Sequence, residues 1–119
     1  MIHEIDANLL EHPLDGILHQ ANCFHTMGGG IALRIKQKWP EAYEADLKTK
    51  YGDKDKMGTF SLAVLPSNFH IFNMYSQFNF GFGRQTDYAA MVKGLEAIKL
   101  YAIENGLQHL GLPRYMGCR

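Results

Sequence analysis

The chain has 119 residues, of which 46% are hydrophobic and 20% charged, and its twelve basic residues balance its twelve acidic residues. This length and mixture predict one globular domain over residues 1–119. The balanced charge and the absence of a long basic run exclude the basic footprint of a nucleic-acid-binding domain, so we expect no nucleic acid partner.

Cysteine usage and hydropathy indicate in which cellular compartment the protein is expected. Cys23 and Cys118 are too few for a disulfide framework. The first residues, MIHEIDANLL, lack the basic start and apolar segment of a signal peptide. No stretch approaches the ~18 apolar residues that a membrane-spanning helix needs. We therefore expect a cytoplasmic protein without a membrane partner.

The first predicted strand covers residues 15–20 (DGILHQ), where a short apolar pair is followed by polar residues. Three consecutive glycines follow at 28–30. Each glycine costs backbone entropy and gives up a side chain that could pack. A run of three therefore makes sense where the backbone itself must contact something.

A helical pattern begins directly after the glycines. Its apolar positions recur at helical spacing, namely Ile31, Ile35, Trp39, Tyr43 and Leu47. Pro40 must interrupt or restart the helix, because its ring clashes with the preceding turn. The lysine-rich segment that follows, residues 48–56 (KTKYGDKDK), alternates in sign and predicts a solvated loop.

Two further strands are predicted at 59–65 (TFSLAVL) and 69–77 (FHIFNMYSQ), where bulky and aromatic residues suit a pleated surface. A glycine- and aromatic-rich loop at 78–85 leads to a long helix, which Thr86 or Asp87 can cap and Gly106 ends. Its expected apolar face consists of Tyr88, Met91, Val92, Leu95, Ile98 and Ala102. A last short strand is expected at 107–113, followed by a loop at 114–119.

This order of strands and helices predicts an α/β sandwich of mostly parallel strands with helices on both faces. Ligands of such sheets bind beyond the carboxyl ends of the strands, where loops lead into helices. The glycine run lies in such a loop, where free N–H groups and the helix dipole would form an anion site. A plain flexible turn is the alternative. The spacing matches neither a Walker loop nor a dinucleotide fingerprint.

The segment ILHQANCFHTMGGGIA, residues 17–32, resembles the first phosphate loop of a macrodomain. In that family a strand ends in an Asn-Ala-Ala-Asn-like segment, and a variable bridge leads to Gly-Gly-Gly and a small apolar pair. Here Ala21 and Asn22 end the strand, and the resemblance extends over nearly the whole chain. It implies a macrodomain-like three-layer α/β/α sandwich with a mixed, mostly parallel sheet.

The resemblance also implies recognition of ADP-ribose or a derivative. Backbone N–H groups of residues 28–32 would bind the diphosphate, and Asn22 would hold the distal ribose. Asn8 stands where the family usually has a carboxylate facing the adenine amine. The ligand-binding residues expected on this basis are Asn8, Ala21, Asn22, Met27, Gly28, Gly29, Gly30, Ile31, Ala32, Gln77, Met116, Gly117 and Cys118. We expect no cofactor and no metal, because the histidines lack metal-ligand spacing.

Two departures from the family matter. Ala32 and Leu33 stand where the glycosyl-ester hydrolase branch has an acidic residue, so the first loop offers no carboxylate to activate water. The Gly-Ile-Ala sequence is more similar to the branch that processes ADP-ribose 1″-phosphate or removes ADP-ribose through other residues.

The second departure is at the end of the chain. The segment LGLPRYMGCR resembles the strand entering the second phosphate loop, so we expect the sheet to lack its last elements. A homodimer that covers the exposed surface is favoured over a shortened form.

Three functions stay open. The chain is an enzyme that hydrolyses ADP-ribose 1″-phosphate or a protein-linked ADP-ribose, a module that binds ADP-ribose without cutting it, or a structural remnant. In the enzyme, Asn22 and His25 are the catalytic candidates. Asn22 would position the scissile centre or its water, and His25 would transfer the proton. A loop-ordering role is the alternative for His25. Cys23 is expected to be a buried spacer, and His19 to be packed or hydrogen-bonded.

Overall fold

The computed structural model describes residues 2–5, 14–28, 30–78 and 87–113 of the chain. The strands are β1 (Ile2–Ile5), β2 (Gly16–Ala21), β3 (Phe60–Val64), β4 (His70–Tyr75) and β5 (Leu110–Pro113). The helices are α1 (Gly30–Lys38), α2 (Pro40–Leu47) and α3 (Tyr88–Glu104), with a short 3₁₀ helix, η2 (Lys54–Lys56).

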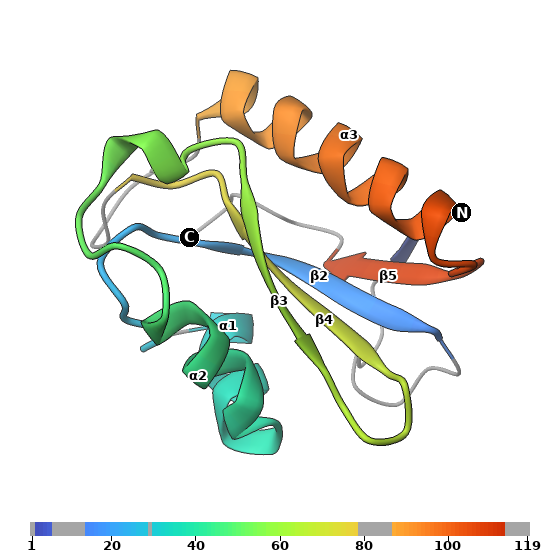
Figure 1. Cartoon of the computed structure of the whole chain (residues 1–119). Helices are drawn as coiled ribbons and strands as arrows, with labels where there is room; N and C mark the ends of the chain where they lie inside the picture. Colours follow the sequence, from blue (N-terminus) through green and yellow to red (C-terminus); the bar gives the residue numbers. More distant parts are fainter. Residues whose placement is uncertain (1, 6–13, 29, 79–86, 114–119) are drawn as a thin grey trace.

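The strands form one mixed sheet in the order β1-β5-β2-β4-β3. Neighbouring strands run parallel except for β3, which pairs antiparallel with β4. Helices α1 and α2 cover one face of the sheet and α3 covers the other (Figure 1). The structure therefore confirms the predicted three-layer α/β/α sandwich with a mixed, mostly parallel sheet.

Most elements lie where the sequence predicts them. The break at Pro40 is confirmed, because α1 ends at Lys38 and Pro40 is the first residue of α2. Asp87 caps α3, since its side chain accepts a hydrogen bond from the N–H of Ala90 at 3.1 Å. Strand β1 was not anticipated. Thr86, most of the predicted loop at 78–85 and the terminal segment 114–119 lie outside the described residues.

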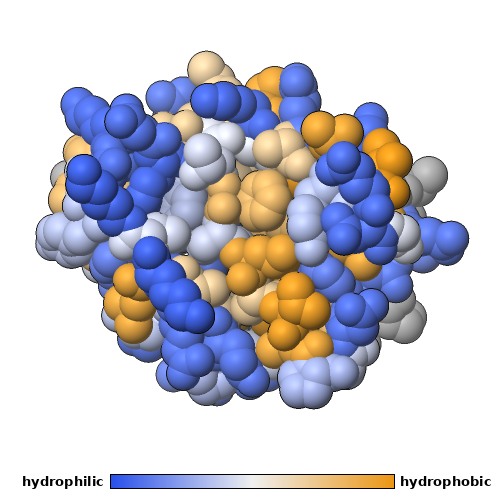
Figure 2. Space-filling view, in the orientation of Figure 1, coloured by the Kyte–Doolittle hydropathy of each residue, from blue (hydrophilic) through white to orange (hydrophobic). Residues whose placement is uncertain are grey.

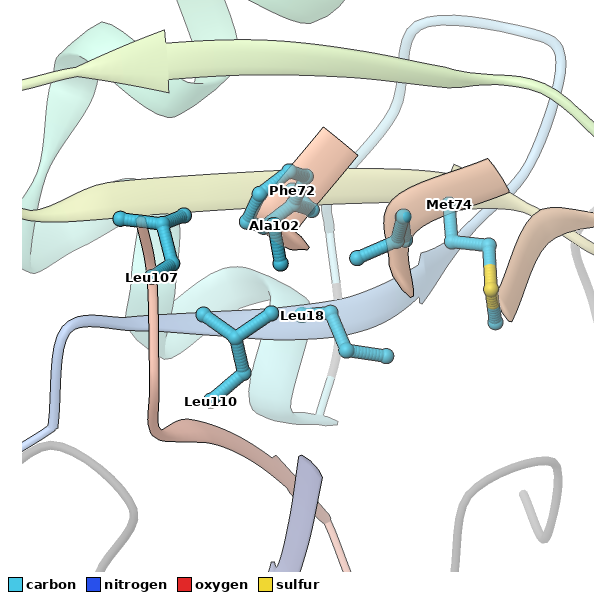
Figure 3. Close-up of a cluster of buried hydrophobic side chains, with 7 residues drawn as sticks. Leu18, Phe72, Met74, Ala102, Leu107 and Leu110 are labelled. Carbon is cyan, nitrogen blue, oxygen red and sulfur yellow. The ribbon is translucent and has the colours of Figure 1, made fainter. Parts of the chain in front are cut away.

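The hydrophobic core has one layer on each side of the sheet. Ile17 of β2 and Ile71 of β4 are fully buried with Ile35 of α1. Their strand neighbours Leu18 and Phe72 point to the opposite face, toward α3 (Figure 3). Strands buried on both faces are expected at the centre of a sheet that carries helices on both sides. Full burial of each such side chain contributes about 1.5–3 kcal/mol.

The expected apolar face of α3 was wrong in part. Ile98 and Ala102 are buried, whereas Tyr88 and Val92 are 46% and 52% exposed. The helix turns Ala90 and Gly94 toward the sheet instead. A Cβ atom at Gly94 would lie 2.6 Å from Cγ of Met74, so the helix approaches the sheet too closely for a larger residue. Small residues thus define the contact face, and spacing of large residues does not reveal it.

Two sequence segments that are far apart meet where β2 and β4 end. The two strands pair in register from Gly16↔His70 to Ala21↔Tyr75. The chain leaves both strands at the same edge, where the N–H of Cys23 donates to the carbonyl of Phe78 at 3.0 Å. The loop after β2 is therefore fixed beside the segment after β4.

No helix within the described ranges is both long and apolar enough to cross a membrane. In the same ranges, no group of three or more His, Cys, Asp or Glu side chains is arranged to hold a metal ion.

Candidate functional site

The connection from β2 to α1 is a tight turn shaped by Asn22. The Oδ1 atom of Asn22 accepts from the N–H of Phe24 at 2.8 Å, and its Nδ2 donates to Oγ1 of Thr26 at 2.5 Å. His25 and Met27 adopt the left-handed backbone region, with φ of 55° and 66°. Such conformations cost of order 1–3 kcal/mol each for non-glycine residues. The bonds of Asn22 and the burial of Met27, which is 3% exposed, offset this cost.

Gly28 stands at the end of this turn, exposed to solvent. A Cβ atom placed on it would meet no atom of the described residues within 4 Å, and its φ lies outside the left-handed region. Gly52 and Gly58 differ, because their φ values of 68° and 84° are left-handed. Neither local packing nor backbone conformation thus requires glycine at position 28. The open space beside its backbone is available to a ligand.

Helix α1 begins two residues later, at Gly30. Its first turn contains no acidic side chain, and Lys36 and Lys38 lie in its last turn. Free N–H groups at a helix N-terminus, together with the helix dipole, attract anions. An acidic residue in the first turn would compete for those N–H groups, and none is present. The start of α1 therefore suits a phosphate group.

The buried side chain of Lys56 supports the turn through hydrogen bonds. Lys56 is 7% exposed, and its Nζ donates to the carbonyl of Cys23 at 3.2 Å and to Oγ1 of Thr49 at 2.9 Å. The N–H of Gly52 donates to the same carbonyl at 2.6 Å. The Nζ atom also lies 4.7 Å from the ring centroid of Tyr75. The expectation of a solvated loop over residues 48–56 is therefore wrong at its end, where η2 turns Lys56 inward.

The charge of Lys56 lies near a buried polar cluster. Tyr75 donates to Oδ1 of Asp46 at 2.6 Å, and its hydroxyl lies 2.8 Å from Oγ of Ser61. Thr49 donates to the backbone carbonyl of Asp46 at 2.6 Å. Burial, together with the bond to Asp46, raises the pKa of the Tyr75 hydroxyl well above its usual range. Tyr75 is therefore a permanent donor to a carboxylate that is only 1% exposed.

His25 points toward the α2–β3 connection. Its Nε2 lies 2.7 Å from the carbonyl oxygen of Thr49, so Nε2 carries the hydrogen and donates it. The hydroxyl of Tyr43 donates to the carbonyl of His25 at 3.0 Å, and the His25 and Tyr51 rings meet edge to face at 5.4 Å between centroids. His25 thus orders the turn through Nε2.

Two neighbouring residues have structural roles. Cys23 is fully buried as expected, with Sγ 3.7 Å from Sδ of Met57, and burial raises the pKa of its thiol. His19 is also fully buried and donates from Nε2 to Oδ1 of Asn73 at 2.7 Å. Its Nδ1 lies 3.0 Å from the carbonyl oxygen of Gln20, and burial lowers the pKa of the ring. The expectation of a hydrogen-bonded His19 is confirmed.

The structure brings a subset of the predicted site residues together at this edge of the sheet. These are Ala21, Asn22, His25, Met27, Gly28, Gly30, Ile31, Ala32 and Gln77. Met27 is buried, so it can offer a ligand only its backbone. Asn8, Gly29, Met116, Gly117 and Cys118 lie outside the described residues.

Sequence reasoning missed the supporting residues Asp46, Thr49, Lys56 and Tyr75. One signal was available for Asp46. It follows Ala42 by four residues, on the face of α2 that is buried. An acidic residue on a buried helix face needs a polar partner, and Tyr75 supplies it.

A comparison with models of known protein families finds no match. Three curated proteins are similar to parts of the chain. An uncharacterized 17.5 kDa protein from the tk-vs intergenic region of Enterobacteria phage T4 is 42% identical over 69 residues, 55% of this chain and 44% of that protein. A DNA ADP-ribosyl glycohydrolase of Thermus aquaticus is 35% identical over 48 residues, 40% of this chain and 13% of that protein.

The third, an ADP-ribose 1″-phosphate phosphatase of Aspergillus oryzae, is 48% identical over 44 residues, 35% of this chain and 21% of that protein. The matched regions thus span less than half the length of each of these relatives.

Solved structures match over almost the whole chain. The macrodomain of Mycobacterium tuberculosis DarG superposes with a TM-score of 0.78 at 21% identity, covering 98% of this chain and 77% of that one. The macrodomain of Thermus aquaticus DarG gives 0.76 at 22% identity, covering 95% and 76%. Thermosipho africanus DarTG in complex with ADP-ribose gives 0.78 at 16% identity, covering 98% and 33%.

The Lys56→Met substitution tests the support beneath the turn. Methionine keeps the length and apolar stem of lysine but removes both hydrogen bonds and the charge. We expect the free energy of unfolding to fall by about 1.5–3 kcal/mol, the usual contribution of hydrogen bonds to a charged group. Urea denaturation measures the change. Lys54→Met, an exposed lysine of the same η2 helix, is the matched control, and equal midpoints for both variants would contradict the buried role of Lys56.

Proposed function

The chain has the macrodomain fold, and from this premise we propose that it binds ADP-ribose or a derivative in the turn between β2 and α1. We further propose that it hydrolyses ADP-ribose 1″-phosphate or a protein-linked ADP-ribose. Two partial relatives, a DNA ADP-ribosyl glycohydrolase and an ADP-ribose 1″-phosphate phosphatase, support a hydrolytic role. The neighbour solved with ADP-ribose supports the ligand class.

The observation that carries the proposal is the open space beside Gly28. The local structure does not require glycine at this position, because a Cβ atom there meets nothing and the φ is ordinary. A ligand that touches the backbone is a reason for the missing side chain. In the proposal, the diphosphate lies against the N–H groups of Gly28 and the first turn of α1, where the dipole is positive.

Asn22 is proposed to hold the distal ribose. Its side chain already makes one bond from Nδ2 and one to Oδ1 within the turn. An amide group has two N–H hydrogens and two oxygen lone pairs. Asn22 can therefore keep both bonds and still offer a donor and an acceptor to neighbouring ribose hydroxyls.

His25 is the proposed proton acceptor. With Nε2 donating to Thr49, the lone pair of the neutral ring lies on Nδ1. During hydrolysis of ADP-ribose 1″-phosphate, a water oxygen attacks phosphorus while Nδ1 takes a proton from that water. The bond from phosphorus to the ribose oxygen breaks, and the proton held by Nδ1 passes to the leaving ribose oxygen, so that the products are ADP-ribose and phosphate. Backbone dipoles around the phosphates would stabilise the developing charge.

A module that binds ADP-ribose without cutting it is the second candidate. It is favoured by the engagement of both catalytic candidates in ordering the turn. Ala32 and Leu33 also supply no carboxylate near the start of α1.

Gly28→Ala tests the binding proposal. We expect the affinity for ADP-ribose to fall at least about tenfold, equivalent to 1.4 kcal/mol, because the new methyl group occupies the space of the diphosphate. Stability should not fall, since the methyl group meets no atom of the residues that the structure describes. Titration calorimetry and thermal unfolding measure the two effects.

Gly106→Ala is the matched control for that experiment. Its surroundings are equally open, but its φ of 71° disfavours alanine, and it lies after α3, away from the candidate site. This variant should lose stability and keep its affinity. Normal ADP-ribose binding by Gly28→Ala, or no binding by the unsubstituted chain, would refute the proposed binding mode.

His25→Asn tests whether the site is catalytic. Asparagine tolerates the left-handed backbone of His25 but cannot accept a proton at neutral pH. We expect phosphate release from ADP-ribose 1″-phosphate to fall about 10²–10⁴-fold, the usual contribution of a general base. ADP-ribosylated peptide and ADP-ribosylated oligonucleotide are tested as alternative substrates. Unchanged turnover would remove His25 from the mechanism, and binding without turnover of any substrate would favour the binding module.

A further inference from the structure

Strand β3 is an open edge of the sheet. It is last in the strand order, and its five residues pair with β4 from Phe60↔Met74 to Val64↔His70 without a bulge. No strand in the described ranges pairs with its other side. That side presents a row of backbone N–H and C=O groups, which is a template for another strand.

The sequence of β3 does not protect this edge. Natural edge strands are usually guarded by charges, proline, bulges or a covering element. The strand reads FSLAV, with neither a charge nor a proline, and Val64 is 51% exposed. Figure 2 shows an apolar strip over the part of the surface where β3 runs in Figure 1. An edge of this kind fits a partner strand.

A groove gives access to the edge. It has a volume of about 430 Å³ and lies between β3 residues 61–64 and one side of α2, where Glu41, Glu44 and Lys48 line it. The backbone of β3 is therefore reachable from the α2 side.

We propose that β3 pairs antiparallel with β3 of a second copy of the chain, about a two-fold axis at Leu62. This register places Leu62 opposite Leu62 of the partner subunit, Phe60 opposite Val64 of the partner subunit, and Ser61 opposite Ala63 of the partner subunit. Along β3, large residues (Phe60, Leu62, Val64) alternate with small residues (Ser61, Ala63). In this register each large residue faces a large residue of the second copy on the α3 face, and each small residue faces a small one on the α2 face. Cross-strand pairs of this kind stabilise sheets.

The charges near the two ends of α2, Glu41 and Lys48, agree with the same axis. Asn73 donates to the carbonyl of Ala42 and Tyr75 to the side chain of Asp46, so α2 runs in the direction of β4 and opposite to β3. Glu41 therefore lies toward the Val64 end of β3, and Lys48 toward the Phe60 end. A two-fold axis at Leu62 exchanges these ends, which directs Lys48 toward Glu41 of the partner subunit, twice in the dimer.

The β3 pairing is complete after two copies, because each copy has one β3 strand and uses it once. A contact built on five residues and two flanking helices belongs to the small, weak class of interfaces. The proposal does not depend on ADP-ribose binding, since β3 is not part of the turn after β2. It differs from the homodimer expected from the sequence, in which the second copy would cover the surface that the absent last elements of the sheet leave exposed.

Sedimentation equilibrium over a dilution series up to about 1 mM, a range suited to weak association, tests the association. We expect the mass to rise with concentration from 13.5 kDa to twice that value and no further. Val64→Lys should abolish the rise, because it charges the edge. Leu100→Lys on α3, a position that is 59% exposed, is the matched control and should leave the rise unchanged. A mass of 13.5 kDa at every concentration would overturn the proposal.

Charge reversal tests the orientation. Lys48→Glu should raise the dimer dissociation constant at least about threefold, as expected for loss of exposed ion pairs, and Glu41→Lys combined with Lys48→Glu should restore it. Failure of the double variant to recover would overturn the predicted orientation.

Disulfide trapping tests the register. In a Cys118→Ser background, Leu62→Cys should form an intermolecular disulfide under mild oxidation, because directly opposite residues bring their Cα atoms within disulfide range. Cys23 is fully buried and stays out of the reaction. Val64→Cys should not crosslink, since its partner position holds Phe60. Equal crosslinking at both positions, or none at Leu62→Cys, would overturn the register.

Discussion

The parallel, in-register pairing of β2 with β4 is the constraint on which the candidate site depends. It brings Ala21 opposite Tyr75, so the turn after β2 and the segment after β4 leave the sheet together. Tyr75 then reaches Asp46 of α2, while Lys56 and Gly52 reach the carbonyl of Cys23. The turn that holds Asn22 and Gly28 is thereby fixed by buried groups outside it, in addition to the hydrogen bonds of its own Asn22 and His25.

The buried polar groups beneath the turn make it rigid, whereas Gly28 and the start of α1 are the parts open to a ligand. The polar atoms beneath the turn are satisfied by one another, and no buried side-chain nitrogen or oxygen in the described ranges lacks a partner. Buried polar groups that are fully hydrogen-bonded specify one geometry. Strain at His25 and Met27 is tolerated for the same reason. Gly28 and the start of α1 are left open above this support, which is where a rigid scaffold would present backbone N–H groups.

The sequence predicts what depends on local chemistry. Pro40 breaks the helix wherever it packs, Asp87 caps α3 through its own backbone neighbours, and the glycine run lies before a helix. The buried face of α3 was mispredicted because the close approach at Gly94 is decided by Met74, twenty residues away in the chain. The sequence pattern places Lys56 in a solvated loop for a similar reason, since the carbonyl that it meets lies 33 positions earlier. Periodicity and charge patterns contain no information about such distant contacts.

The proposed function requires that backbone N–H groups at the end of the β2–α1 turn bind a diphosphate. Amide chemical shifts of the ¹⁵N-labelled chain, followed during titration with ADP-ribose, measure this most directly. We expect large, saturable shifts for the amides of residues 28–32, and smaller ones at Asn22. Saturable shifts confined to other parts of the chain, with these amides unmoved, would contradict it.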